Sequence, residues 1–325
     1  MEFRKNSDGT VTLERYTGSN EDVVIPEGVY DIRSNAFHGC SIRSVKFPDS
    51  LRVIGDDAFG CCLHLSKIKF GCGPLKIGQS AFESCLCLEE VDLCGVEEIG
   101  EFAFLRCERL KNVKLHEGLK TIKCCAFLLS QGMKEISLPS SVYELNGGCF
   151  EHVDKIEIKG QYIPKRFLSA FSNSGGSAGL TISINGNIVM IPKRIDLKYY
   201  ADIVELLQNF NRKSGERASF FQIALLPEDS LNMALDAYSS GDPEAELYLR
   251  ENFVPLVHKM GKEDVFLNIC NRLRELGLMS KDLAEEAFPA IQRKEWTRAV
   301  SYMLEFFNEN SEEYGDEYEE ERFAL

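Results

Sequence analysis

Hydrophobic residues recur through the first half of the chain at steps of 22 or 23 residues. The dipeptide Ala-Phe, replaced by Cys-Phe in the last copy, occurs six times, and an aliphatic residue stands four positions before each copy. The six phenylalanines are Phe37, Phe59, Phe82, Phe104, Phe127 and Phe150. A unit of this length cannot bury its own apolar face, whereas stacked copies can. The pattern therefore predicts a solenoid in which each apolar side chain contacts its equivalent one turn away.

Each unit begins with a short triplet, in which one apolar residue stands on each side of a middle residue. Examples are residues 45–47 (Val-Lys-Phe) and 68–70 (Ile-Lys-Phe). Alternation with period two indicates strands whose middle residue faces solvent. Since no full helix separates successive triplets, we expect a parallel-stranded solenoid, with 23–25 and 156–158 as its first and last strands. In three copies a glycine follows the aliphatic residue, namely Gly55, Gly78 and Gly100. We expect a tight bend at these glycines, with a left-handed backbone as one option.

The complete unit resembles the BspA-type leucine-rich repeat, whose pattern is L-x-x-I-x-L-P-x-x-L-x-x-I-G-x-x-A-F-x-x-C. The copy over residues 42–62 matches this pattern almost throughout, and the resemblance covers about residues 9–171. It implies a leucine-rich-repeat surface that serves in protein interactions, and many proteins of this family are bacterial cell-surface adhesins. The fold alone transfers no particular ligand.

From residue 196 onward the apolar spacing becomes helical. Residues 249–273 align with residues 283–307 at an offset of 34, and Pro255 matches Pro289 in the same register. We therefore expect two copies of a helical hairpin, bent at the prolines and turning near Gly261 and Lys294. The ankyrin and tetratricopeptide signatures are missing, so this repeat is assigned to no family.

The expected fold class is α+β, with a leucine-rich-repeat parallel β solenoid followed by an all-α helical-hairpin domain. Its parts are an N-terminal cap segment (1–22), the BspA-type repeats (23–171), a loop and capping hairpin (172–195), the helical domain (196–308) and a tail (309–325). The hairpin turns at Asn185-Gly186 and would close the open end of the sheet. The tail carries eight acidic residues and one basic residue between 309 and 322, which predicts disorder.

Charge and hydropathy limit the partners. The chain has 37 basic and 51 acidic residues, a formal net charge of −14, and no basic block, which argues against nucleic acid. No apolar run is long enough for a membrane span. The first twenty residues lack the apolar core of a secretory signal, so we expect a cytoplasmic protein if Met1 is the native start. The alternative is an exported cell-surface adhesin whose signal was removed.

Twelve cysteines are present, and eleven of them lie between Cys40 and Cys149. Four stand three residues after a phenylalanine of the repeat, so we expect reduced and mostly buried thiols that pack as small apolar groups. The cluster at residues 61–64, with Cys85 and Cys87, is interpreted as core thiols rather than as a zinc site. Phosphate-loop and dinucleotide motifs are missing. We therefore expect no metal, no cofactor and no catalytic residues, with an enzyme in the helical half as the alternative from another class.

The middle residues of the triplets form a column on the solvent side of the stacked strands. The column consists of Lys46, Lys69, Asp92, Lys114, Ser137 and Glu157. Its first four members are basic except for Asp92, in a chain whose net charge is −14. We therefore expect a non-enzymatic protein-binding protein that presents this column to an acidic partner, and a merely solvated face is the alternative.

Overall fold

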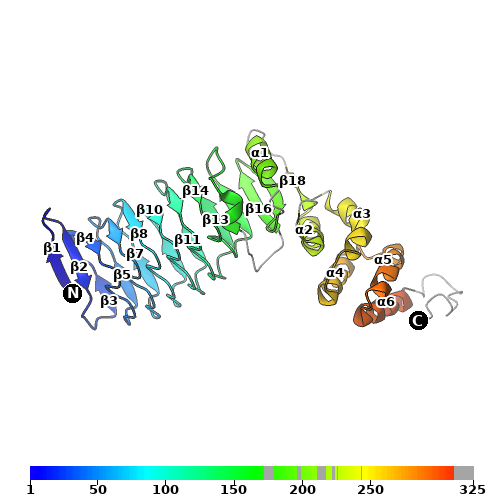
Figure 1. The fold of residues 1–325 in the computed structure, drawn as a ribbon, viewed down its shortest axis with the longest axis horizontal. Coiled ribbons are helices and arrows are strands. Elements are labelled where there is room, and N and C mark those ends of the chain that lie inside the picture. The colour runs from blue at the N-terminus through cyan, green and yellow to red at the C-terminus, as the bar shows by residue number, and fades with distance from the viewer. Residues whose placement is uncertain are drawn as a thin grey trace. The chain divides into compact units, whose positions relative to one another are not determined.

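The structure is a computed structural model of the 325-residue chain. It describes residues 1–171, 179–195, 199–210, 217–221, 224, 226–242 and 244–310. The chain divides into two compact units, a solenoid unit (Met1–Ile223) and a helical unit (Ala224–Leu325), shown in Figure 1. The expected loop at 172–178 and the acidic tail from 311 onward lie outside the described residues.

One face of the solenoid unit is an eight-stranded sheet, here called sheet A. Its strands follow the order β1-β2-β4-β6-β8-β10-β12-β14, antiparallel in the first pair and parallel in the others. They are β1 (Glu2–Lys5), β2 (Val11–Arg15), β4 (Val29–Ile32), β6 (Val53–Ile54), β8 (Leu75–Ile77), β10 (Val96–Ile99), β12 (Thr121–Ile122) and β14 (Glu144–Leu145). Each parallel strand contributes the buried aliphatic residue of its repeat.

The triplets form the second face, here called face B. Its strands are β3 (Asp22–Val24), β5 (Ser44–Lys46), β7 (Lys67–Lys69), β9 (Glu90–Asp92), β11 (Asn112–Lys114), β13 (Glu135–Leu138), β15 (Lys155–Ile158), β16 (Gly179–Ile184), β17 (Asn187–Pro192) and β18 (Arg217–Ser219). They pair as three separate ladders, β3-β5-β7, β9-β11 and β13-β15-β16-β17-β18. Within the described strands, the ladder is thus interrupted between β7 and β9 and again between β11 and β13. Ile68 of β7 and Val113 of β11, the last strands before these interruptions, are only half-buried, whereas Val45 of β5 and Val91 of β9 are buried.

A ladder of phenylalanine rings runs through the core of the solenoid unit. The six repeat phenylalanines are buried, and neighbouring rings stack with centroids 4.6 to 5.8 Å apart. Tyr16 stacks on Phe37 at one end at 4.8 Å, and Phe171 of the 3-10 helix η1 (Phe167–Phe171) lies 5.9 Å from Phe150 at the other. The expected stack of equivalent residues is therefore present, and the predicted fold class is confirmed.

Left-handed residues flank each Ala-Phe turn, but they are not the glycines that the sequence suggested. The backbone is left-handed at Asn35, Asp57, Ser80, Phe102 and Cys125, two residues after the position of Gly55 and its equivalents. At Gly55 itself an added Cβ would lie 2.6 Å from the Ser34 backbone nitrogen, and at Gly100 it would lie 2.5 Å from the carbonyl carbon of Gly78. The left-handed option was therefore wrong, because these glycines are needed for the close approach of successive turns.

The solenoid continues beyond the strand that was expected to be its last. Strand β16 pairs in parallel with β15, and β17 returns antiparallel through a turn with positive φ at Asn185 and Gly186. The side chain of Lys193 is buried and pairs with Asp154 at 2.7 Å, which holds the end of this hairpin to the preceding turn. Helix α1 (Tyr200–Phe210) follows within the same unit.

The helical unit consists, in its described part, of five helices of 13 residues each. They are α2 (Pro227–Ser239), α3 (Ala245–Val257), α4 (Glu263–Glu275), α5 (Lys281–Arg293) and α6 (Thr297–Glu309). Helices α3 and α5 contain the matching prolines Pro255 and Pro289, and α3 packs on α5 as α4 packs on α6. Polar contacts join the two copies: Lys294 donates to the Met260 carbonyl at 2.7 Å, and the Ala299 amide donates to Glu263 at 2.9 Å. The predicted pair of helical hairpins is thus observed.

Candidate binding surfaces of the repeats

The six column residues lie on one side of face B, as predicted. Strand pairing aligns Lys46 with Lys69, Asp92 with Lys114, and Ser137 with Glu157. All six are exposed except Ser137, which is half-buried. The two interruptions of the ladder fall between these pairs, so the column consists of three short segments rather than one continuous row.

Some charged and polar side chains of the column contact one another. Lys114 lies 3.9 Å from Asp92, and His116 lies 2.6 Å from the other oxygen of the same carboxylate. Further along, the Ser137 hydroxyl donates to Glu157 at 2.6 Å. Lys114 is an exposed base, as expected, but the Asp92 carboxylate on the neighbouring strand faces its ammonium.

Free positive charge is concentrated on β5 and β7. Lys46, Lys67 and Lys69, here called the lysine cluster, are exposed and have no ion pair within the described part of the chain. Lys67 is not in the predicted column, which contains only the middle residue of each triplet. Period-two alternation places Lys67 on the same side as Lys69, so the Lys-Ile-Lys sequence carries the signal.

A cleft of about 370 Å³ lies at the interruption between β7 and β9. The lysines of β7 form one side, and the exposed carboxylates Glu90 and Asp92 of β9 form the other. Ile68 and Val91 contribute to its lining. The cleft therefore combines positive charge, negative charge and some apolar surface next to the lysine cluster.

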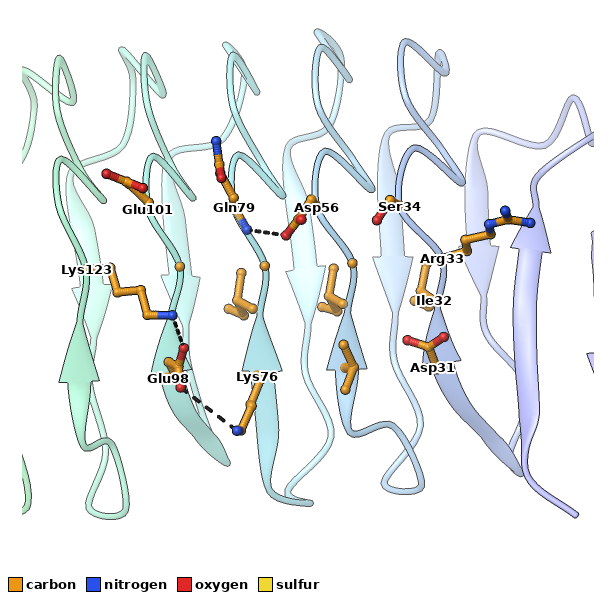
Figure 2. Close-up of a pocket in the computed structure, with 16 residues that line it drawn as sticks. Asp31, Ile32, Arg33, Ser34, Asp56, Lys76, Gln79, Glu98, Glu101 and Lys123 are labelled. Atoms are coloured by element: carbon orange, nitrogen blue, oxygen red, sulfur yellow. Dashed lines mark hydrogen bonds and ion pairs between the residues drawn. The ribbon is translucent and has the colours of Figure 1, made fainter. Parts of the chain in front are cut away.

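Sheet A carries a larger groove, which was not among the sequence predictions. Its volume is about 540 Å³, and Gly55, Gly78 and Gly100 contribute to its lining (Figure 2). Three successive turns have no side chain at these positions, so the surface is hollow there. The Ile-Gly dipeptide repeated in three consecutive copies was the signal that could have revealed the groove.

Most charged groups in this groove already have partners. Figure 2 shows Lys76 and Lys123 on either side of Glu98, with Lys76 at 4.0 Å, and both lysines form ion pairs with this carboxylate. The Asp56 carboxylate accepts a hydrogen bond from the Gln79 backbone amide at 2.8 Å. Burial raises the pKa of Asp31, although a hydrogen bond from Thr12 opposes this shift. The groove therefore offers little unpaired charge to a ligand.

The cysteines are all free thiols, as expected, but they are not mostly buried. Five are buried, namely Cys62, Cys85, Cys107, Cys149 and Cys270, and the other seven are half-buried or exposed. The expectation failed because only the cysteines in register with the core were weighed, whereas others occupy turns at the surface. No group of three or more metal-ligating side chains occurs among the residues that the structure describes.

The buried repeat thiols form a ladder of their own. Cys62 donates to the Phe37 carbonyl at 3.1 Å, Cys107 donates to the Phe82 carbonyl at 3.2 Å, and Ser130 takes the same role toward Phe104 at 3.2 Å. Burial raises the pKa of Cys62 and that of Cys107 to about 12. These thiols therefore stay protonated and poorly nucleophilic near neutral pH.

Stacked turns of 22 or 23 residues, each with parallel strands on two faces, define a leucine-rich-repeat solenoid protein. The model of the BspA type leucine rich repeat region matches residues 15–98 and 75–191, with six copies, and so spans more than half of the chain. The chain belongs to this family.

Several solved structures of bacterial leucine-rich-repeat proteins are similar to the chain. A cell surface protein from Faecalibacterium prausnitzii is 23% identical, with a TM-score of 0.40, and the match covers 59% of each chain. A protein from Bacteroides capillosus is 31% identical over 35% of this chain and 92% of its own, with a TM-score of 0.30. The T. pallidum leucine-rich-repeat protein is 19% identical over 67% of this chain and 96% of its own, with a TM-score of 0.39.

No curated protein matches the chain. Among the described residues, no helix has the length and apolar character needed to cross a membrane.

Proposed function

We propose that the chain is a non-enzymatic protein-binding protein whose lysine cluster on face B receives an acidic segment of a partner protein. The observation that supports this proposal is the set of three exposed, unpaired lysines on two neighbouring strands. Several other lysines of the solenoid unit form ion pairs with carboxylates, namely Lys76, Lys120, Lys123 and Lys155. The lysine cluster is the part of the predicted column that keeps its charge available.

The electrostatics of the whole chain favour a short acidic segment over a large anionic surface. A net charge of −14 disfavours the approach of nucleic acid and anionic membranes. At physiological ionic strength the interaction between exposed charges is screened beyond about 8 Å, so a local patch of lysines still attracts a nearby carboxylate. The cleft between β7 and β9 adds apolar lining from Ile68 and Val91, which suits an acidic segment that also carries apolar side chains.

Binding of a fluorescein-labelled, glutamate-rich peptide, followed by fluorescence anisotropy, tests this function. The variant K46E/K67E/K69E should bind at least about tenfold more weakly, since three exposed ion pairs are worth roughly 0.5 kcal/mol each. Binding by the unmodified chain should weaken as salt is added. Far-UV circular dichroism should show an unchanged fold, because exposed substitutions rarely alter stability.

A matched control carries the same change in charge elsewhere. Lys5, Lys165 and Lys259 are exposed and without an ion pair in the described structure, and K5E/K165E/K259E should bind the peptide almost normally. Equal losses in both variants would show that only net charge matters, and this would overturn the proposed site. Equally tight binding of a DNA oligonucleotide of the same charge would overturn the preference for a protein partner.

The cellular location follows as part of the same proposal. We place the protein in the cytoplasm, and the twelve free thiols support a reducing compartment. Fractionation of the native cells, with the protein found at the surface, would favour the exported alternative.

A further inference from the structure

Two surface thiols lie against each other at the interruption between β7 and β9. The Cys94 thiol donates a hydrogen bond to the Cys72 sulfur, and the two Sγ atoms are 3.4 Å apart. Cys72 is exposed and Cys94 is half-buried. In the described part of the chain, this is the one hydrogen bond between two thiols.

Backbone packing holds this pair in place. Cys72 and Cys94 stand in the turns that follow β7 and β9, and the Cys72 amide donates to the Asp49 carboxylate at 2.8 Å. At Gly95, where φ is +74°, an added Cβ would lie 2.4 Å from the Gly73 carbonyl oxygen, so the two turns are in direct backbone contact. A side chain at Gly95 would push the turns, and with them the thiols, apart.

We propose that Cys72 and Cys94 are a thiol–disulfide exchange site, which a small-molecule disulfide oxidises to an intramolecular disulfide that joins β7 to β9. The sulfurs need to approach only from 3.4 Å to about 2.05 Å. The new bond would bridge the interruption between two ladders that share no strand pairing there.

The chemistry proceeds in two exchange steps. The Cys72 sulfur, which accepts the hydrogen bond, attacks as the thiolate on one sulfur of the small disulfide. A mixed disulfide forms, and the first small thiolate leaves and takes up a proton. Cys94 then attacks the Cys72 sulfur, and the second small thiol is released. Both protein thiols are oxidised, and one small disulfide is reduced to two thiols.

The other thiols are unsuited to this reaction. Burial raises the pKa of Cys62 and that of Cys107 to about 12, and both donate to backbone carbonyls. Cys61 is exposed but has no hydrogen bond to another thiol in the described structure. The hydrogen bond with Cys72 raises the pKa of Cys94, so the second step should accelerate as the pH rises.

Native incubation with oxidised glutathione, followed by alkylation in denaturant, tests the proposal. Intact-mass analysis should show ten alkylated cysteines of the twelve and no glutathione adduct. Peptide mapping should find Cys72 linked to Cys94. The oxidised chain should also have a higher thermal midpoint than the reduced chain, and dithiothreitol should reverse this rise.

Two variants separate the pair from general thiol reactivity. C72S should retain eleven thiols after the same treatment, or carry glutathione on Cys94, and its thermal midpoint should not rise. C61S, which removes an exposed thiol outside the pair, should still form the link. A lasting glutathione adduct on Cys72 beside a free Cys94, a link between any other two cysteines, or twelve free thiols under conditions that oxidise a control dithiol peptide would each overturn the proposal. Since these readouts do not involve the acidic peptide, they leave the proposed binding function to its own test.

Discussion

At the scale of single residues, period-two alternation predicts which side chains are exposed, but it does not predict which backbone segments are in contact. Period-two alternation places Lys46 and Lys69 on the solvent side of face B, and the structure agrees. The ion pair between Lys114 and Asp92 was also within reach, because equivalent residues of adjacent turns stand side by side. The role of the glycine in the Ile-Gly dipeptide could not be predicted, because a close approach between two backbones does not change the pattern of hydropathy.

The close approach at Gly78 leads to a prediction about stability. An added Cβ would lie 2.8 Å from the Asp56 amide nitrogen and 2.8 Å from the carbonyl carbon of Gly55. G78A should therefore lower the free energy of unfolding by roughly 1–3 kcal/mol, as overpacked sites do. Urea unfolding followed by circular dichroism measures this loss.

Gly147 supplies the matched control in the same unit. Its Cβ position has only the Ser169 carbonyl oxygen nearby, at 3.8 Å, and its φ is not in the left-handed region. G147A should stay within about 0.5 kcal/mol of the unmodified chain. Equal losses at both positions would mean that glycine is needed for some reason other than contact between turns.

At the scale of strands and turns, the repeat predicts what each turn contains but not how each turn pairs. The phenylalanine stack follows from spacing alone, since each ring meets its equivalent one turn away. The interruptions after β7 and β11 are not indicated by the order of apolar residues, because the triplets on both sides of each interruption alternate in the same way. The turn dipeptide Asn185-Gly186 did predict the hairpin of β16 and β17, but not the parallel pairing of β16 with β15.

The ladder of buried thiols predicts a loss of stability at alkaline pH. Burial raises the pKa of Cys62 and that of Cys107 from 9.0 to about 12. Between these values the unfolded chain loses the protons while the folded chain keeps them, so stabilisation that is complete below pH 9 declines as the pH rises. Each of these two thiols should lower the free energy of unfolding by about 1.4 kcal/mol per pH unit across this range.

Variants of one buried and one exposed cysteine measure this effect. Urea unfolding under reducing conditions between pH 9 and pH 11 gives the slope of stability against pH. C107A should have a slope shallower by about 1.4 kcal/mol per pH unit than the unmodified chain. C61A, which removes an exposed thiol, should leave the slope unchanged. An unchanged slope in C107A would mean that this thiol ionises equally in the folded and unfolded chain.

At the scale of the whole molecule, the sequence predicts two kinds of repeat, and the structure contains both. The boundary is harder to read, because helix α1 belongs by contacts to the solenoid unit although its apolar spacing is that of a helical domain. Apolar periodicity reports which side of a helix is buried, but it does not report which unit covers that side. Each unit nevertheless has its own set of buried residues, so we expect each to unfold on its own.

One tryptophan makes this independence measurable. Trp296, the only tryptophan of the chain, lies 5.6 Å from the ring of Phe266 within the helical unit, whereas buried Cys107 reports on the solenoid core. F266L should lower the denaturation midpoint seen by Trp296 fluorescence and leave the midpoint for alkylation of Cys107 unchanged. F82L, in the phenylalanine ladder, should do the reverse, with a loss of roughly 1–3 kcal/mol in the solenoid. If both variants shift both midpoints equally, the chain unfolds as a single cooperative unit, because only shared cooperativity transmits a core defect from one set of buried residues to the other.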